Sequence, residues 1–375
     1  VLNKVEVQRL LLDLARQPRP QDFLDSALRD SSISRPQLET LGLVRREGEN
    51  YVISFLLFTS EDMIRMREVT EAQARTLAGA LLARRAEMED ALKQHSPPGI
   101  DPSAVAYILL GCFSLDWDGL DLTAEKGYWS RAEREREDGR AVVWAWEPTE
   151  LSNKGLYWGS HNSSYGDASF TSFGDHYIQP RLALPDLLWS LPRRATQGNW
   201  PEPLKAKVQA VMQVSLGTVG ERMGLMMLAL RDGDKTLPEL ARAAGIETDT
   251  AAPLAALLVE LGYVTRQGEQ YQARVPVLHR RDVSLVRQIR RIGWQVMEQW
   301  LAANYDSLKK ELSQLTPFRY GVPLTDMFWQ IWHYIFGAAN RRLVEAGFFA
   351  DPYAESRGAR GVITVVFHRS LRTAR

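Results

Sequence analysis

The feature of this chain that most constrains its fold is an internal repeat. Residues 38–97 align with residues 258–317 without a gap, so that Leu38 matches Leu258 and Pro97 matches Pro317 at one constant offset. The identical pairs fall on turn and core positions and include Leu41-Gly42 with Leu261-Gly262, Gly48-Glu49 with Gly268-Glu269, and Tyr51 with Tyr271. A period this long indicates a duplicated domain rather than a solenoid of short units. We therefore expect two homologous halves, residues 1–150 and 222–375, around an unmatched segment.

The similarity continues beyond the gapless region. Gly127-Tyr128-Trp129 matches Gly347-Phe348-Phe349 at the same offset, and the strand-like Ala141–Trp146 matches Val362–Phe367 one residue out of register. A helical stretch precedes each glycine turn, over Ser103–Phe113 in the first half and Thr325–Ala346 in the second. Each half is therefore predicted to end in a small α/β cap.

The second half shows its local structure most clearly. Thr236 is a candidate helix N-cap, Pro238 suits the first turn, and Gly245 ends that short helix. A second helix runs to Gly262, with leucines at helical spacing. Residues 263–277 then read as a β-hairpin that turns at Gly268.

This order of helices and hairpin resembles the winged helix-turn-helix superfamily of bacterial transcription regulators. The resemblance covers Leu237–Tyr271, where a helix runs into Leu-Gly-Tyr-Val-x-Arg-x-Gly-x-x-Tyr. The first half follows the same plan with fewer residues between its second and third helices; its segments are Val5–Ala15, Gln21–Leu28, Ser34–Leu41 and the wing Leu43–Phe58. The resemblance implies a third helix that enters the DNA major groove and a wing that touches phosphate or the minor groove.

Each wing leads into a long amphipathic helix, with apolar residues such as Val69, Leu77, Ile289 and Val296 on one face. The two long helices either pair within the chain or pack only on their own halves. We predict an α+β, mainly helical fold of tandem winged-helix domains that form an intrachain pseudo-dimer. The expected ranges are 1–97 (first winged helix and long helix), 98–150 (first cap), 151–221 (aromatic-rich insertion and linker helix), 222–317 (second winged helix and long helix) and 318–375 (second cap).

The predicted function is a DNA-binding transcriptional regulator. Its expected DNA contacts are Arg35, Gln37, Arg45 and Arg46 in the first copy and Thr248, Thr250, Arg266, Arg274, Arg280 and Arg281 in the second. Residues 263–295 hold seven arginines against Glu269 and Asp282, which suits contact with phosphate. The third helix of the second copy, Thr248–Leu261, offers none of the side chains that usually read bases. The alternative is therefore a winged-helix module for protein interaction or ligand binding, without sequence-specific DNA binding.

Aromatic residues cluster around the end of the first half and the unmatched segment. They form ordinary cap cores, or a pocket for a small aromatic or apolar effector that shifts the spacing of the two winged helices, or an exposed surface that binds a partner. The predicted effector contacts are Trp144, Trp146, Trp158, His161 and Tyr165. The nearby His161, Asp167, Asp175 and His176 match no metal-ligand spacing, so we expect neither metal nor cofactor. Phosphate-loop, nucleophile-elbow and zinc-protease motifs are absent, which predicts a non-enzymatic protein, although a catalyst within 150–180 stays open.

Composition limits the remaining classes. The 46 basic and 46 acidic residues give a net charge of zero, so any DNA-binding face must be local. The single cysteine, Cys112, excludes an intrachain disulfide, fits a reducing compartment and lies in an apolar run that predicts a buried thiol. Apolar runs are too short to span a bilayer and the chain start shows no signal-peptide pattern, so we expect a cytoplasmic protein without a membrane partner. It is expected to be a pseudo-dimeric monomer or to form a further homodimer.

Overall fold

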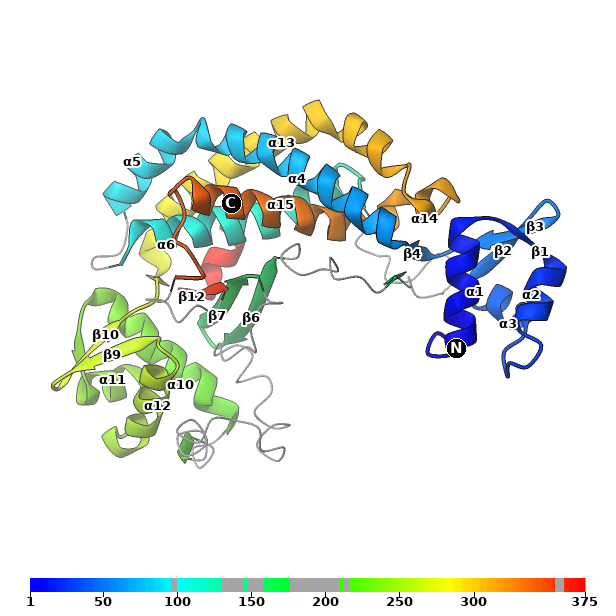
Figure 1. The fold of residues 1–375 in the computed structure, drawn as a ribbon. Helices are drawn as coiled ribbons and strands as arrows, with labels where there is room; N and C mark the ends of the chain where they lie inside the picture. Colours follow the sequence, from blue (N-terminus) through cyan, green and yellow to red (C-terminus); the bar gives the residue numbers. More distant parts are fainter. Residues whose placement is uncertain are drawn as a thin grey trace. The chain divides into compact units, whose positions relative to one another are not determined.

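The computed structural model describes residues 1–95, 100–129, 144–147, 158–175, 210–211, 216–354 and 361–374 (Figure 1). Over these residues the fold is mixed α+β and mainly helical, with small sheets. Contacts divide the chain into two compact units. Unit 1 comprises Val1–Leu77, Gly119–Leu156 and Glu298–Ala339, and unit 2 comprises Ala78–Asp118, Tyr157–Met297 and Asn340–Arg375.

Unit 1 begins with a small helix and hairpin module, residues 1–58, which we call the N-terminal module (Figure 1). Its elements are α1 (Val5–Arg16), β1 (Arg19–Pro20), α2 (Gln21–Ala27), α3 (Arg35–Thr40), β2 (Val44–Glu47) and β3 (Asn50–Ile53). The strands form a sheet in the order β1-β3-β2, and Gly48 turns the hairpin with a positive φ of 63° that favours glycine. The apolar faces of the helices meet in a core that includes Leu10, Leu24 and Leu38.

Unit 2 contains the corresponding C-terminal module, residues 216–278. Its elements are α10 (Leu216–Ala229), β8 (Lys235–Thr236), α11 (Leu237–Ala244), α12 (Thr248–Glu260), β9 (Val264–Gln267), β10 (Gln270–Ala273) and β11 (Val277–Leu278). As the sequence predicts, Thr236 caps α11 in a capping box with Glu239, and Gly245 ends that helix in the left-handed conformation. The sheet order β8-β10-β9 repeats that of the N-terminal module.

The two modules repeat each other in detail. Arg46 and Arg266 each donate from Nε to the carbonyl oxygen of the turn glycine two residues later. The pairing Arg19↔Tyr51 corresponds to Lys235↔Tyr271, and the second copy holds more residues between these two strands than the first. The third helix has 13 residues in the second copy and 6 in the first. The link between the second and third helices is longer in the first copy, residues 28–34 against 245–247, so the expected shorter link is wrong.

The long helices also correspond. Helix α13 (Val283–Leu312) is continuous, whereas its counterpart divides into α4 (Ser60–Leu82) and α5 (Arg85–His95). Asp62 and Asp282 each accept a hydrogen bond from the backbone N–H three residues earlier, where these helices begin. A turn at α14 (Thr316–Arg319) follows α13.

The later elements keep the same plan. Helix α6 (Pro102–Ala106), the π-helix η1 (Tyr107–Asp118) and α7 (Gly119–Glu125) correspond to η4 (Leu324–Asp326) and α15 (Phe328–Glu345). Parallel pairs follow: β4 (Leu56–Phe58) with β5 (Trp144–Trp146), and β11 with β12 (Val362–His368). Phe58 pairs with Trp146 and Leu278 with Phe367, which reproduces the one-residue shift seen in the sequence.

The contacts group the chain differently from the five consecutive ranges expected from the sequence. The boundaries of the units, Leu77 and Met297, are equivalent positions within the two long helices. Each unit therefore combines a module from one half with helical segments from both halves. The range 318–375, expected as one cap, divides at Ala339. Connectivity alone cannot show this division, because a single long helix contributes to the cores of both units.

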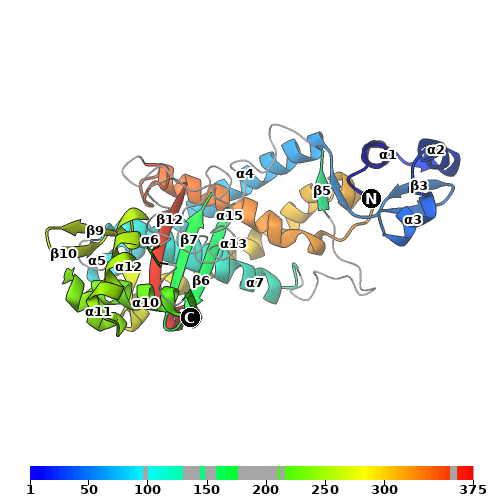
Figure 2. The same cartoon turned by 90° about the horizontal axis from the view of Figure 1, so that it is seen from below.

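Unit 2 contains two strands without a counterpart in unit 1 among the described residues. Strands β6 (Gly159–Tyr165) and β7 (Ala168–Gly174) come from the unmatched segment and extend the sheet in the order β11-β12-β7-β6 (Figure 2). All seven residues of β7 are buried, and β7 pairs antiparallel with β12 over its whole length. Strand β7 is thus part of the core of unit 2.

Candidate nucleic-acid interface

The hairpin of the C-terminal module carries a concentration of exposed amide and guanidinium groups. We call residues 263–274 the C-terminal wing. Arg266, Gln267, Gln270 and Gln272 are exposed along its two strands. Gln267 pairs with Gln270 and Thr265 with Gln272, so these four side chains share one face of the hairpin. Amide and guanidinium groups are the donors and acceptors that read base edges and bind phosphate.

Arg266 is held at the tip of this wing. Its Nε donates to the Gly268 carbonyl oxygen at 2.9 Å, and its guanidinium carbon lies 5.5 Å from the centroid of the Tyr271 ring. Among the described residues its terminal nitrogens make no further hydrogen bond. The side chain is therefore oriented while part of its donor capacity stays accessible to a ligand.

The third helix of the same module presents a different surface. The exposed or half-buried positions of α12 are Thr248, Asp249, Thr250, Ala252, Pro253, Ala256, Val259 and Glu260. The two threonines expected to contact DNA thus reach the surface in the first turn. The rest of that face is small and apolar between two acidic side chains, so it carries none of the usual base-reading groups.

The expected contacts of the third helix in the N-terminal module are engaged within the module itself. Arg35 donates to Asp25, Glu39 and the Tyr51 hydroxyl, and its side chain is 18% exposed. The hydrogen bond to Glu39 raises the pKa of the Arg35 guanidinium. Gln37 completes the capping box of α3 by accepting from the Ser34 N–H. Both side chains therefore make contacts within the module that stabilise the third helix, instead of extending toward DNA.

The basic residues of the N-terminal wing are also partly engaged. Arg45 donates to the Tyr320 carbonyl oxygen at 2.6 Å and lies 3.4 Å from Glu47. Arg46 repeats the contact of Arg266 with its turn glycine. Glu47 and Glu49 are exposed beside them, so this wing is less favourable for phosphate than the C-terminal wing.

The other arginines of the basic stretch differ in their environments. Arg280 donates to Nε2 of His368, and Arg281 pairs with Asp232. Arg290, which contributes to the basic stretch seen in the sequence, is buried against Asp118. Arg274 lies in the lining of a pocket. Arg287 and Arg291 are exposed on α13 and, among the described residues, their side chains make no hydrogen bond or ion pair. The basic stretch therefore divides between ion pairs, core, pocket and exposed surface, and only part of it is available to phosphate.

The residues expected to form an aromatic effector pocket fall into both units. Trp144 and Trp146 are half-buried on β5 of unit 1, with ring centroids 5.0 Å apart. Trp158 is fully buried in unit 2, where its ring packs against Tyr107 and Phe173. His161 and Tyr165 are half-buried on β6. Trp158 is therefore a core residue, as the plainer interpretation of the aromatic cluster holds.

The acidic and histidine residues near β6 have other contacts. Asp167 lies 3.6 Å from Nε2 of His368, and Asp175 accepts from the Tyr353 hydroxyl at 3.1 Å. His176 lies outside the described residues, as does most of the range 176–215. Within the described chain, no group of histidine, cysteine and acidic residues is arranged to hold a metal ion. Cys112 is buried as predicted, and burial raises the pKa of its thiol.

Known proteins offer no relative from which the role of this surface could be transferred: no protein-family model, curated protein or solved structure matches the chain. Any function must therefore follow from the geometry of its own residues. Among the described residues, no helix combines the length and apolar character needed to cross a membrane.

Three wing glutamines were not predicted from the sequence as contacts. Gln267, Gln270 and Gln272 surround the Gly268 turn, and their alternation on a hairpin would have placed them on one exposed face. The arginines dominate the sequence pattern instead, because net charge is visible without knowing which residues pair. The amide row is the feature that the geometry adds to the candidate interface.

Proposed function

We propose that this protein is a double-stranded DNA-binding transcriptional regulator with two winged-helix modules, in which the C-terminal wing supplies the main DNA contacts. The exposed row of Gln267, Gln270 and Gln272, with the anchored Arg266 on the opposite face of the same hairpin, carries this proposal. The helix, strand, helix, helix and hairpin order of both modules supports the winged-helix assignment. Two such modules in one chain would act as an intrachain pseudo-dimer on two half-sites.

In this proposal, the wing rather than the third helix distinguishes base sequences. Arg266 contacts phosphate or the minor groove, Gln267 and Gln270 reach base edges, and Thr248 and Thr250 contact the backbone at the start of α12. Arg280 and Arg281 have no primary role, because acidic or histidine partners already hold them. Arg35 and Gln37 act through the stability of the N-terminal module.

The test uses fluorescence anisotropy of labelled duplexes selected from a random pool, over a salt series. Arg266→Ala should weaken binding about fivefold and reduce the slope of log affinity against log salt by about 1. Gln267→Ala with Gln270→Ala should reduce the preference for the selected duplex about tenfold. The matched control is Arg46→Ala, which removes the same glycine contact in the other wing. Equal effects of Arg46→Ala and Arg266→Ala would contradict the assignment to the C-terminal wing.

A second candidate function is a protein-interaction module, and the surface of α12 favours it. Ala252, Pro253 and Ala256 form a small apolar face that suits packing better than groove recognition. Ala256→Arg separates the two functions. If α12 lies in a DNA groove, the added cation should tighten DNA binding several-fold. Absence of DNA binding by the unmodified protein at low salt would instead support the protein-interaction function.

A further inference from the structure

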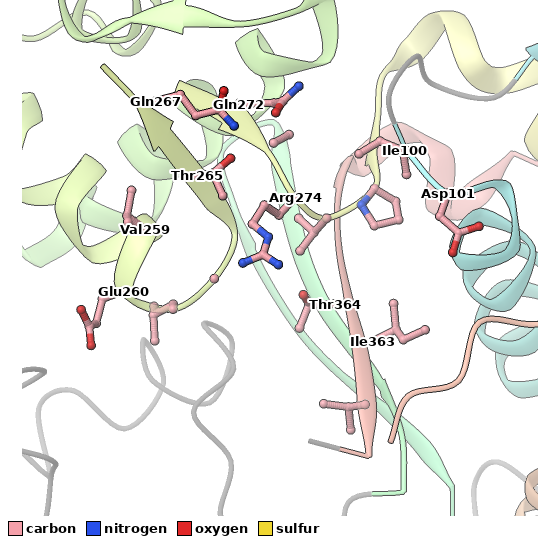
Figure 3. A pocket seen from close by; sticks show the side chains of 16 residues that line it. Ile100, Asp101, Val259, Glu260, Thr265, Gln267, Gln272, Arg274, Ile363 and Thr364 are labelled. Carbon is pink, nitrogen blue, oxygen red and sulfur yellow. The ribbon is translucent and has the colours of Figure 1, made fainter. Parts of the chain in front are cut away.

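A pocket of about 750 Å³ lies at the base of the C-terminal wing, within unit 2. We call it the wing-base pocket. Its walls come from the end of α12, the two wing strands, the segment leading to β11, and the start of β12 (Figure 3). This volume lies in the range that holds a drug-sized ligand. The polar side chains of its lining include Arg274, Thr265 and Thr364.

Arg274 is the central feature of the wing-base pocket. Its backbone N–H donates to the Tyr263 carbonyl oxygen at 2.9 Å, which fixes the start of the side chain. The side chain is exposed and extends between β9 and β12, with Thr265 on one side and Thr364 on the other (Figure 3). Within the described chain it makes no hydrogen bond or ion pair. A guanidinium in a concave site is suited to bidentate binding of a carboxylate.

The other module shows that this arginine is not required by the fold. Ser54 occupies the equivalent position, and its backbone N–H makes the equivalent bond to the Leu43 carbonyl oxygen at 3.1 Å. Its hydroxyl donates to the Gly42 carbonyl oxygen, so the short side chain is satisfied locally. The hairpin thus closes with either residue, and Arg274 adds a cation that the hairpin itself does not use.

The remaining lining limits the charge and shape of the ligand. Val259, Val275 and Ile363 supply apolar surface beside Arg274. Two acidic residues, Asp101 and Glu260, lie at opposite ends of the pocket (Figure 3). The Asp101 carboxylate accepts from the Ser103 N–H and hydroxyl. Acidic groups at both ends repel a polyanion, whereas a single negative charge can meet Arg274 at the centre.

We infer that the wing-base pocket binds an amphipathic monocarboxylate, with its carboxylate on Arg274 and its apolar part against Val259, Val275 and Ile363. The hydroxyls of Thr265 and Thr364 supply additional hydrogen-bond donors. This site differs from the aromatic pocket expected from the sequence. The inference does not rest on DNA binding, although Thr265, Gln267 and Gln272 of the pocket lining lie on the same hairpin face as the proposed DNA contacts.

Isothermal titration calorimetry with decanoate tests this inference, with decylamine and decanol as probes of the same chain length. Decanoate should bind the full chain saturably, and decanol and decylamine at least about tenfold more weakly, because they lose the charge-assisted bond. Arg274→Gln should weaken decanoate binding about tenfold, and Arg274→Lys less. The control Arg266→Gln, on the other face of the hairpin, should leave decanoate binding unchanged.

A second variant tests the location without altering charge. Thr364→Tyr fills the wing-base pocket from a half-buried position on β12 and should abolish decanoate binding. Thermal unfolding of each variant shows whether it folds. If Thr364→Tyr does not fold, the test rests on Arg274→Gln, because the Arg274 side chain is exposed and its replacement leaves the core intact. Equal binding of decanoate and decylamine, or binding that survives both variants, overturns the inference. So does the absence of saturable binding to the unmodified protein below about 1 mM.

Discussion

The two units contain equivalent helices, but different side chains are buried at equivalent positions of these helices. In unit 2, Asp118 and Arg290 form a buried ion pair with oxygen to nitrogen distances of 2.5 and 2.8 Å. In the alignment of the two halves these positions correspond to Ala338 and Thr70, both buried in unit 1. Both positions are buried in both units, but they carry charged side chains only in unit 2. A duplicated core can therefore gain a buried ion pair without losing its helical plan.

A second equivalent contact shows the same divergence. In unit 1, the rings of Tyr128 and Tyr305 stack with centroids 3.5 Å apart. In unit 2 the corresponding residues are Phe348 and Arg85, and the guanidinium carbon lies 5.3 Å from the ring centroid. A ring stack and a cation–π contact occupy the same place because both need one flat group on an aromatic face. Contact geometry is thus more constant than side-chain chemistry between the units.

The largest predicted effect comes from breaking the buried ion pair. Asp118→Ala leaves the Arg290 guanidinium buried without its counter-ion, although it still donates to the carbonyl oxygens of Leu371, Arg372 and Ala374. We expect a loss of about 3–5 kcal/mol in the local stability of unit 2, measured by hydrogen exchange of peptides from η1 and the start of α13.

Two further variants sharpen this prediction. Asp118→Ala combined with Arg290→Met should be less destabilising than the single change, because no charge remains buried. The control is Glu298→Ala in unit 1, which removes an exposed pair with Lys126 and should cost less than about 1 kcal/mol. A small effect of Asp118→Ala would mean that the carbonyl oxygens alone satisfy Arg290.

The next prediction is that lowering the pH from about 6.5 to 4 destabilises unit 1, whereas raising it from about 4 to 7 destabilises unit 2. Burial lowers the pKa of His333 in unit 1 to about 4, and burial raises the pKa of Asp116 in unit 2 to about 7. The folded state therefore favours neutral His333, whose contribution is lost as the pH falls from about 6.5 to 4. It also favours protonated Asp116, whose contribution is lost as the pH rises from about 4 to 7.

The equivalent residue supplies one of the two test variants. His333→Phe introduces the residue found at the corresponding Phe113 and should remove an acid-side loss of about 3 kcal/mol in unit 1. Asp116→Asn should remove a loss of similar size in unit 2 as the pH rises from about 4 to 7. Hydrogen exchange of peptides from residues 328–339 of α15 and from η1, corrected for its intrinsic pH dependence, measures each unit separately. If both units lost stability with the same change of pH, the prediction would be refuted.

The smallest predicted effect concerns the two wings. Glu47 corresponds to Gln267, so Glu47→Gln gives the N-terminal wing the amide of its counterpart and removes one negative charge. DNA affinity in the anisotropy assay should rise about twofold to threefold at low salt, and the gain should shrink at high salt. The reciprocal Gln267→Glu should weaken binding more strongly. An unchanged affinity for Glu47→Gln would show that the N-terminal wing lies away from bound DNA.

Several local features were predictable because short-range rules govern them. The cap at Thr236, the helix end at Gly245 and the hairpin turn at Gly268 follow from backbone preferences within a few residues. The one-residue shift between the last strands also appears in the sequence, and the parallel pairs reproduce it. The third helix of the first copy was predicted as Ser34–Leu41, close to the observed Arg35–Thr40.

The candidate site was less predictable, because its chemistry depends on pairing across long sequence separations. Arg281 and Arg290 look alike in the sequence, yet one meets exposed Asp232 and the other buried Asp118. Arg35 suits base reading by type, but it is held by Asp25 and Glu39. Arg274 looks like another phosphate contact until β12 is placed beside it.

The sequence by itself determined the duplication, the order of elements in each half and the local helix and turn signals, since these depend on residue periodicity and backbone preference. Tertiary structure decided how the halves are divided between two units, which arginines are buried or paired, and where a pocket opens. The physical reason is that burial and ion pairing depend on residues brought together from distant segments. Side chains of the same type at similar spacing in the sequence can therefore be buried in the core, exposed on the surface or placed in a ligand pocket.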